Sequence, residues 1–449
     1  MLMTFVRAFR TADVRKKLLF TIGLIALFRF GSYLPVPGIS ERDVQYCSGL
    51  ETASGSSTAG LYAVLNVLSG NSLQHLSVFA LTIMPYITAS IIIQLLTQVI
   101  PRLQALKQDG HAGTAKITQY TRYLTVGLAV LQSTAYVEAA RMGSLFPGTT
   151  CSATNYPLIP HPSAFTIVTM TITMVSGTAV IMWMGELVTD RGIGNGMSVL
   201  IFTSVLAVIP GELEQVYLTK GISYAVATVL VIIAVVAFVV FMEQAQRRIP
   251  VQYAKRMAGR RMYGGASTYI PMKVNQAGVI PVMFASSLLY LPQLAVTQFG
   301  NADHPEPWAS WVDRYLSTQS LAAVGTSYVY YAMFFLLILG FTFFYVLITF
   351  NPAEVADAMK KYGGFVLGIR PGRPTAEYLN YVLTRLTTPG SAYLGAIALF
   401  PMVALGAIGV GDQFLFSGVS LLIMVGVGLD TVKQIESQLQ QRHYRGFLN

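Results

Sequence analysis

Two glycine-rich strings contain residue types that phosphate binding and proteolysis use. The first, Gly192-Ile193-Gly194-Asn195-Gly196, resembles the turns whose backbone amides approach a phosphate. That chemistry needs a strand before the turn within a βαβ unit, and long apolar segments flank this string instead. The second, Gly409-Val410-Gly411-Asp412, carries the short pattern of intramembrane aspartyl proteases, but the chain has no Tyr-Asp partner for it. We predict turns between membrane helices at both places.

Other chemistry is also missing from the sequence. It has no Walker motif and no metal-ligand spacing, so we expect no cofactor, no metal site and no enzyme. Its two cysteines, Cys47 and Cys151, are too few for a disulfide framework or a metal cluster. Both fall in segments that we place outside the membrane. A bridge between them is compatible with that placement, although no spacing argument joins them.

Composition indicates lipid as the solvent. Charged residues make up 11% of the 449 residues, against roughly 25% in a soluble domain. Uncharged runs such as 222–242 are too long for the buried strands of a soluble α/β protein. A span needs about 20 helical residues. We predict spans at 18–36, 75–98, 117–140, 163–187, 195–211, 222–242, 274–297, 327–350, 386–408 and 413–432.

Basic residues orient these spans. With the N-terminus in the cytoplasm, all but five of the 30 Lys and Arg residues lie on the cytoplasmic side, as expected from the positive-inside rule. The exceptions are Arg29, Arg42, Arg141, Lys220 and Arg314. We therefore predict a multi-pass inner-membrane protein with both termini cytoplasmic. The first span has no small-residue cleavage site, so we expect it to be retained.

Charge within the spans is rare. Arg29 lies toward the outer end of the first span, and we expect its side chain to extend to the lipid headgroups rather than to act inside the membrane. No acidic residue occupies the middle of a predicted span. Carriers coupled to protons or cations usually keep a carboxylate there, so this pattern argues against a carrier.

Three other segments have a distinct character. Residues 60–71 are apolar but too short to span, which favours either a re-entrant element or an amphipathic helix on the outer surface. Residues 243–273 and 351–385 are basic cytoplasmic loops. Alternation within 249–253 predicts a short strand or hairpin, and we interpret both loops as a docking surface for an anionic partner. Pro85 and Pro281 predict kinks in the second and seventh spans.

Several strings, in order along nearly the whole chain, resemble the SecY family of bacterial Sec translocase channel subunits. They are Phe79–Leu96, Gln119–Tyr123, Glu186–Gly196, Gln246–Ile249, Tyr253–Arg256, Lys273–Pro281 and Gly368–Gly372. The resemblance implies an all-α polytopic membrane protein of ten transmembrane helices. It implies two pseudo-symmetric five-helix halves, 1–215 and 216–449, hinged at 211–221, with residues 60–71 as a re-entrant plug helix.

The resemblance also implies a function, a set of sites and partners. The chain would pass unfolded secretory chains through a pore ring and release signal sequences and membrane helices through a lateral gate. The implied pore ring is Ile83, Ile87, Ile201, Met283 and Ile423. The implied lateral gate is Thr88, Gln94, Gln132 and Asn275. The implied partner-docking residues are Lys255, Arg260, Arg261 and Arg370.

The implied partners are the SecE and SecG subunits, the SecA motor, the ribosome, precursors with signal sequences, and membrane lipids. An apolar ring resists wetting and holds a passing chain without binding it, and Met283 adds flexibility to an otherwise branched ring. Two alternatives are a secondary carrier for a small solute and a membrane protease or lipid enzyme. The missing midplane carboxylates and catalytic groups argue against both.

Overall fold

The computed structural model describes most of the chain. The described ranges are 11–44, 75–142, 157–253, 256–258, 261–263, 267–299, 327–408 and 418–445, with Phe9, Tyr46, Cys47, Gly70, Ser72, Pro307, Trp311, Val312 and Tyr315. Gln45 lies outside them. Most of the predicted plug segment and Cys151 also lie outside them.

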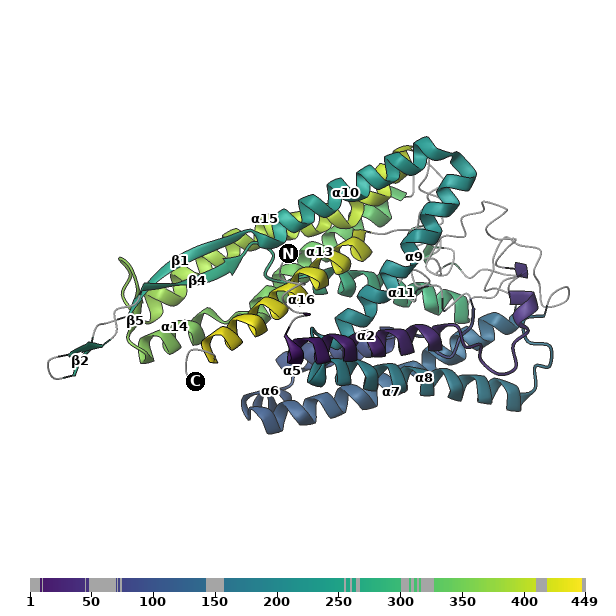
Figure 1. Ribbon diagram of the computed structural model, residues 1–449, viewed down its shortest axis with the longest axis horizontal. Helices are drawn as coiled ribbons and strands as arrows, with labels where there is room; N and C mark the ends of the chain where they lie inside the picture. Colours follow the sequence, from purple (N-terminus) through teal and green to yellow (C-terminus); the bar gives the residue numbers. More distant parts are fainter. Residues whose placement is uncertain are drawn as a thin grey trace.

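Ten long helices lie at the ten predicted spans within this part of the chain (Figure 1). They are α2 (Ala12–Ser32), α5 (Met84–Val99), α7 (His111–Met142), α8 (Ala164–Arg191), α9 (Gly196–Lys220), α10 (Ile222–Gln244), α11 (Ile280–Phe299), α13 (Ser327–Thr349), α15 (Arg373–Ile408) and α16 (Gly418–Arg445). The shorter α6 (Pro101–Gln108) follows α5, and α14 (Pro352–Lys361) follows α13.

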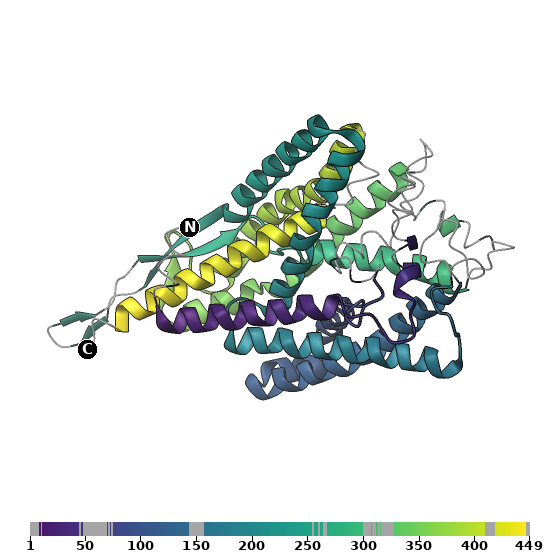
Figure 2. The same ribbon diagram turned by 45° about the vertical axis from the view of Figure 1, so that its right-hand side comes forward.

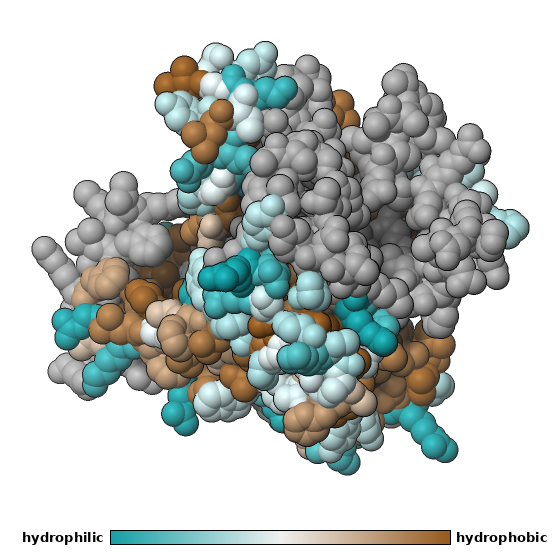
Figure 3. Space-filling model, turned by 90° about the vertical axis from the view of Figure 1, so that its right-hand side faces the viewer, coloured by the Kyte–Doolittle hydropathy of each residue, from teal (hydrophilic) through white to brown (hydrophobic). Residues whose placement is uncertain are grey.

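The surface of these helices suits hydrocarbon. Within the described ranges, five segments have the length and composition of a membrane span, or six if the bent pair Met84–Thr97 and Pro101–Lys107 is one span. The most apolar of the five is Ile222–Gln244, yet only 17% of the most apolar part of this helix is buried inside the protein. Apolar side chains also reach the surface at the end of the molecule shown in Figure 3. Lipid must cover such surface, while the full ten-span count stays a prediction.

The helices form two groups that meet along α9. In one group α5 packs on α7, α7 on α8 and α8 on α9; in the other α13 packs on α15 and α11 on α13. Helix α9 packs substantially on both α10 and α16, whereas α5 touches α11 only briefly (Figures 1 and 2). The junction between the groups is therefore well packed on one side and sparse on the other.

Two helix boundaries correct the sequence predictions. Pro85 and Pro281 do not kink spans, because α5 begins at Met84 and α11 at Ile280. Proline fits the first helical turn, where its missing N–H removes no hydrogen bond. The predicted 211–221 connection is also mostly helix: α9 continues to Lys220, and Gly221 at φ +92° joins it to α10. Val216 is fully buried, so packing extends this helix.

The two loops predicted to be cytoplasmic form one protrusion. Strand β1 (Gln246–Tyr253) pairs antiparallel with β4 (Ser267–Lys273) and also with β5 (Gly364–Val366). The predicted strand at 249–253 is confirmed, and β2 (Arg256–Ala258) pairs with β3 (Arg261–Tyr263) beyond it. The second loop is more helical than predicted, since it contains α14 and the start of α15.

Apolar side chains from both loops hold this protrusion together. Ile249 and Met272 from the first loop are buried with Val366, Leu379 and Leu383 from the second. Along β1, Ile249 and Val251 face this core while Gln252 is exposed. Neither loop has such a core alone, so we expect them to fold as a unit.

We predict that Ile249→Ala loosens the protrusion, because it leaves a cavity in this shared core. The expected cost is about 2–5 kcal/mol in the free energy of local unfolding. Trypsin should then cleave the folded protein faster at Arg247 and Arg248. Gln252→Ala, on the exposed face of the same strand, is the matched control, and equal cleavage of both variants would contradict the shared core.

Candidate functional site

The five residues of the implied pore ring share one apolar cluster. Ile83, Ile201 and Ile423 are buried, with exposures of 4%, 8% and 3%, and Ile87 and Met283 pack against the same cluster. They come from α5, α9, α11 and α16, with Ile83 at the residue that caps α5. The structure thus brings these residues together from four helices. Their role as a ring stays a prediction.

Helix α2 supports the turn that positions Ile83. Phe28 stacks on Phe79 with ring centroids 6.0 Å apart. The Phe79 ring also lies against Gly31, where an added Cβ would come within 2.1 Å of it, so only glycine allows this approach. Thr82 has a φ of +48° and its N–H donates to the Phe79 carbonyl at 2.9 Å. This tight turn places Ile83 at the start of α5.

Arg29 faces the protein interior, which corrects our expectation that it reaches the headgroups. Its guanidinium donates to the carbonyl oxygens of Gly70 at 3.3 Å, Thr203 at 3.1 Å and Ser204 at 3.3 Å. The side chain is half-buried, and lipid-facing neighbours such as Phe30 point elsewhere. Backbone acceptors nearby satisfy the charge better than a distant headgroup would.

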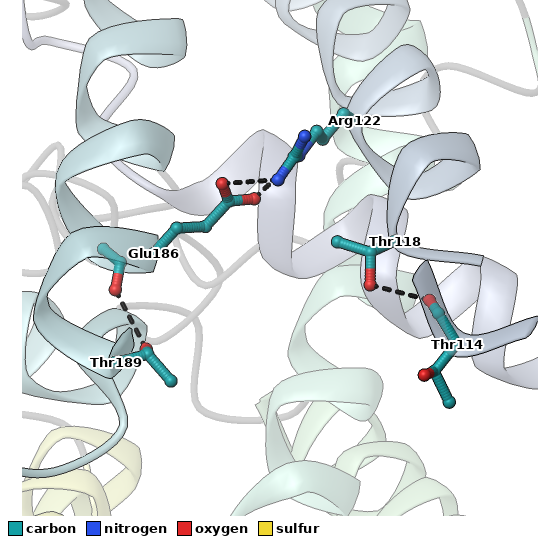
Figure 4. Close-up of polar contacts among 6 residues, drawn as sticks. Thr114, Thr118, Arg122, Glu186 and Thr189 are labelled. Atoms are coloured by element: carbon teal, nitrogen blue, oxygen red, sulfur yellow. Dashed lines mark hydrogen bonds and ion pairs between the residues drawn. The ribbon is translucent and has the colours of Figure 1, made fainter. Parts of the chain in front are cut away.

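A cavity of about 480 Å³ adjoins the apolar cluster. Ile87, Ile201 and Met283 line it together with Gln94 and the charged residues Arg122, Glu186 and Asp190. Arg122 Nε and Nη2 donate to the two carboxylate oxygens of Glu186 at 2.8 and 2.7 Å, which ties α7 to α8 (Figure 4). The cavity is therefore polar on one wall and apolar where it meets the cluster.

The four predicted gate residues lie in different surroundings. Gln94 lines the cavity, and its amide donates to Ser90 at 3.4 Å. The Thr88 hydroxyl donates to Met84 within its own helix, and Gln132 is half-buried on α7. Asn275 is buried and donates to the carboxylate of Glu243, at the end of α10, and to Gly278 O at 3.3 Å.

Among the described residues, Asn275 thus forms hydrogen bonds within its own helix group and none to α5. Its carboxamide oxygen is buried without a hydrogen-bond partner among the described residues, and so is the hydroxyl of Tyr393 on α15. Gly390 allows α15 to lie close to the segment before α11, because an added Cβ at this residue would meet Val274 O at 2.4 Å. The gate assignment of all four residues stays a prediction.

The predicted docking residues belong to the protrusion where the structure describes them. Arg370 is exposed in the turn between β5 and α15, and its carbonyl accepts the Thr375 hydroxyl at 2.8 Å. Gly368 and Gly372, with φ of +81° and +105°, shape this turn. Arg261 pairs with Ala258 in the β2–β3 hairpin. Lys255 and Arg260 lie outside the described residues.

Two other sequence predictions have clear outcomes. Residues 192–196 are a tight turn between α8 and α9, where Gly196 lies so close that an added Cβ would come within 1.9 Å of Gly185 O. This glycine serves helix packing and not phosphate binding. Cys47 is disulfide-bonded, and the only other cysteine of the sequence, Cys151, lies outside the described residues.

Sequence reasoning missed the Arg122–Glu186 and Asn275–Glu243 contacts. Each acid lies near the end of its span that we predict to be cytoplasmic, and that placement alone suits a solvated charge. For Arg122 and Glu186 the available signal was opposite charge at the same predicted membrane depth on neighbouring spans. That signal cannot select one partner among the many basic residues on this side.

Known proteins similar to this chain were found by sequence and by structure. A family profile described as SecY matches residues 77–432. A protein translocase subunit SecY from Streptomyces scabiei is 58% identical over 457 residues, and the alignment covers the full length of this chain and of that protein.

Two solved structures share the fold at 18% identity, each covering 94% of this chain and 91% of the other. One concerns the SecY plug domain, which stabilises the closed state of the translocation channel and maintains a membrane seal, with a TM-score of 0.62. The other is Sec61 in the canine ribosome-channel complex, with a TM-score of 0.60.

We predict that Arg122 and Glu186 stabilise the cavity wall as a pair. Arg122→Gln and Glu186→Gln should each lower the midpoint of thermal unfolding, and the double variant should lower it no further. The coupling free energy should be about 0.2–1 kcal/mol, because both side chains are partly exposed. The control pair, Arg373 and Glu377, has exposures of 90% and 67%, so it should show weaker coupling. Additive losses at Arg122 and Glu186 would contradict the pairing.

Proposed function

Because this chain belongs to the SecY family, we propose that it forms the protein-conducting channel of the Sec translocase in the bacterial cell membrane. The observation that carries this proposal is the convergence of Ile83, Ile87, Ile201, Met283 and Ile423 beside a polar cavity. As a translocase subunit it is not an enzyme, and energy for transport comes from its partners. The α2 start and α16 end lie toward the protrusion, which supports two cytoplasmic termini (Figure 1).

The apolar cluster gives the channel its central property. Branched apolar side chains exclude water and ions when they pack together, yet they offer no hydrogen bond to a passing chain. An unfolded secretory chain can then displace them and leave without breaking polar contacts. Met283 adds a flexible side chain that fits residues of varied size.

The sparse contact between α5 and α11 supports a lateral gate on that side. Substantial packing of α9 on α10 and α16 supports a hinge opposite to it, between halves 1–215 and 216–449. A signal sequence would insert an apolar helix at the α5–α11 seam and leave into lipid. Gln94 lines the cavity beside α11 residues Ile280 and Met283, and so supports its place at the gate.

The solved SecY plug structure supports a plug role for residues 60–71, which would seal the channel from outside the apolar cluster. The basic protrusion supports docking of the ribosome and of the SecA motor through Lys255, Arg260, Arg261 and Arg370. The related ribosome-bound channel points the same way. SecE would brace the two halves at the hinge, SecG would complete the complex, and lipids would cover the remaining apolar helix faces.

We predict that Ile201→Asn makes the resting channel leak ions while precursors still cross. The amide admits water into a cluster that otherwise excludes it. Conductance across planar bilayers should rise several-fold for the reconstituted translocase. Leu218→Asn, on an exposed position of the same helix, is the control. Unchanged conductance with Ile201→Asn, or solute uptake by wild-type protein without partners, would contradict the channel.

We also predict that Arg370→Glu abolishes motor-driven translocation without affecting insertion of the variant into the membrane. It reverses a charge in a turn whose backbone is already fixed by glycines, so the fold should tolerate it. ATP-driven precursor translocation into vesicles measures the effect. Arg102→Glu on the exposed face of α6, outside the protrusion, should translocate normally. Normal translocation by Arg370→Glu would remove this residue from the docking site.

A further inference from the structure

Arg29 is the one basic residue of the first span, and it bonds two segments that are far apart in sequence. Its guanidinium donates to Gly70 at the end of the 60–71 segment and to Thr203 and Ser204 on α9. The α9 acceptors lie within one helical turn of Ile201 in the apolar cluster. A half-buried charge within a predicted span therefore links Gly70 to the part of α9 that carries Ile201.

The backbone at both acceptor sites, Gly70 and α9, lies close to the Arg29 guanidinium. Gly70 has a φ of +67°, which favours glycine, and an added Cβ would lie 2.8 Å from Arg29 Nη1 and 3.2 Å from Ser204 O. On α9 the Ser204 hydroxyl donates to Leu200 O, and the Ser204 carbonyl oxygen accepts from Arg29. A guanidinium suits this place because its planar fork donates to several acceptors at once.

The same stretch of α2 also braces the ring. Phe28, the residue before Arg29, stacks on Phe79 and belongs to the apolar cluster with Ile83 and Ile201. One short segment of α2 thus contacts Gly70, near the end of the plug segment, through Arg29 and the turn before α5 through Phe28. If either Gly70 or Phe79 moves, this segment of α2 loses a contact.

We propose that Arg29 is a positioning residue that anchors the C-terminal end of the plug segment to α9 in the closed channel. This rests on the proposed function, since it assumes a channel that residues 60–71 seal. Release of Gly70 from the guanidinium is then part of opening. Release of Gly70 leaves Thr203 and Ser204 as acceptors but removes one of the three bonds of a charged group within the membrane, so the closed state is favoured unless another acceptor replaces Gly70.

The test measures resting ion leak and precursor translocation for the reconstituted translocase. Arg29→Gln should raise the leak about tenfold, because it removes charge-assisted hydrogen bonds. Precursors with defective signal sequences should cross more often, and precursors with normal ones should cross as in wild type. Arg29→Lys keeps the charge with poorer geometry and should leak less than Arg29→Gln.

Gly70→Ala tests the other side of the contact. Its Cβ crowds Nη1, so the variant should leak as Arg29→Gln does, and the double variant should leak no more than the leakier single one. Arg141→Gln is the matched control, since this arginine is exposed and pairs with Glu138 at 3.2 Å.

Three results would overturn the proposal that Arg29 anchors the plug segment. The first is an unchanged ion leak when Arg29→Gln is present in the membrane at its normal level, and the second is additive leaks in the double variant. The third is loss of normal translocation in both Arg29→Gln and Arg29→Lys, which indicates general misfolding. Failure of the channel proposal itself is separate, because wild-type protein would then translocate no precursor.

Discussion

One cluster of apolar side chains constrains the whole structure, because the helices pack there and the proposed passage crosses there. Ile83, Ile201 and Ile423 must exclude water as core residues do, yet separate without a polar cost when a chain passes. Dispersion and hydrophobic contacts meet both requirements, whereas hydrogen bonds would hold the helices or the substrate. The polar bonds of this region lie at its margins, at Arg29 and at Arg122.

The proposed opening motion depends on where the two helix groups pack strongly. Helix α9 packs substantially on α10 and α16, and a single residue, Gly221, joins α9 to α10. The opposite contact, between α5 and α11, is brief. Residues 274–279 connect strand β4 to α11, so a partner on the protrusion would bind to the loop that continues into this helix. The proposed docking loop and the proposed gate helix α11 are thereby close together in the chain.

The sequence alone was sufficient for the positions of the long helices, since long uncharged runs have few other structures. The grouping of Ile83, Ile87, Ile201, Met283 and Ile423 came from family resemblance, because periodicity cannot say which helices meet. Pro85 and Pro281 were misread, as a proline within an apolar run fits either a kink or a helix start. The direction of Arg29 and the β1–β5 pairing depend on contacts between distant segments, which no local pattern encodes.

The most direct test of a conducting apolar cluster is site-specific photocrosslinking of a secretory chain stalled during translocation. Photoreactive residues would replace Ile83, Ile201 and Ile423, and for comparison the exposed Ile172 and Leu336 on α8 and α13. We predict strong crosslinks to the mature part of the stalled chain at the three cluster positions and weak ones at the exposed positions. Crosslinks confined to Ile172 and Leu336 would contradict the cluster as the passage.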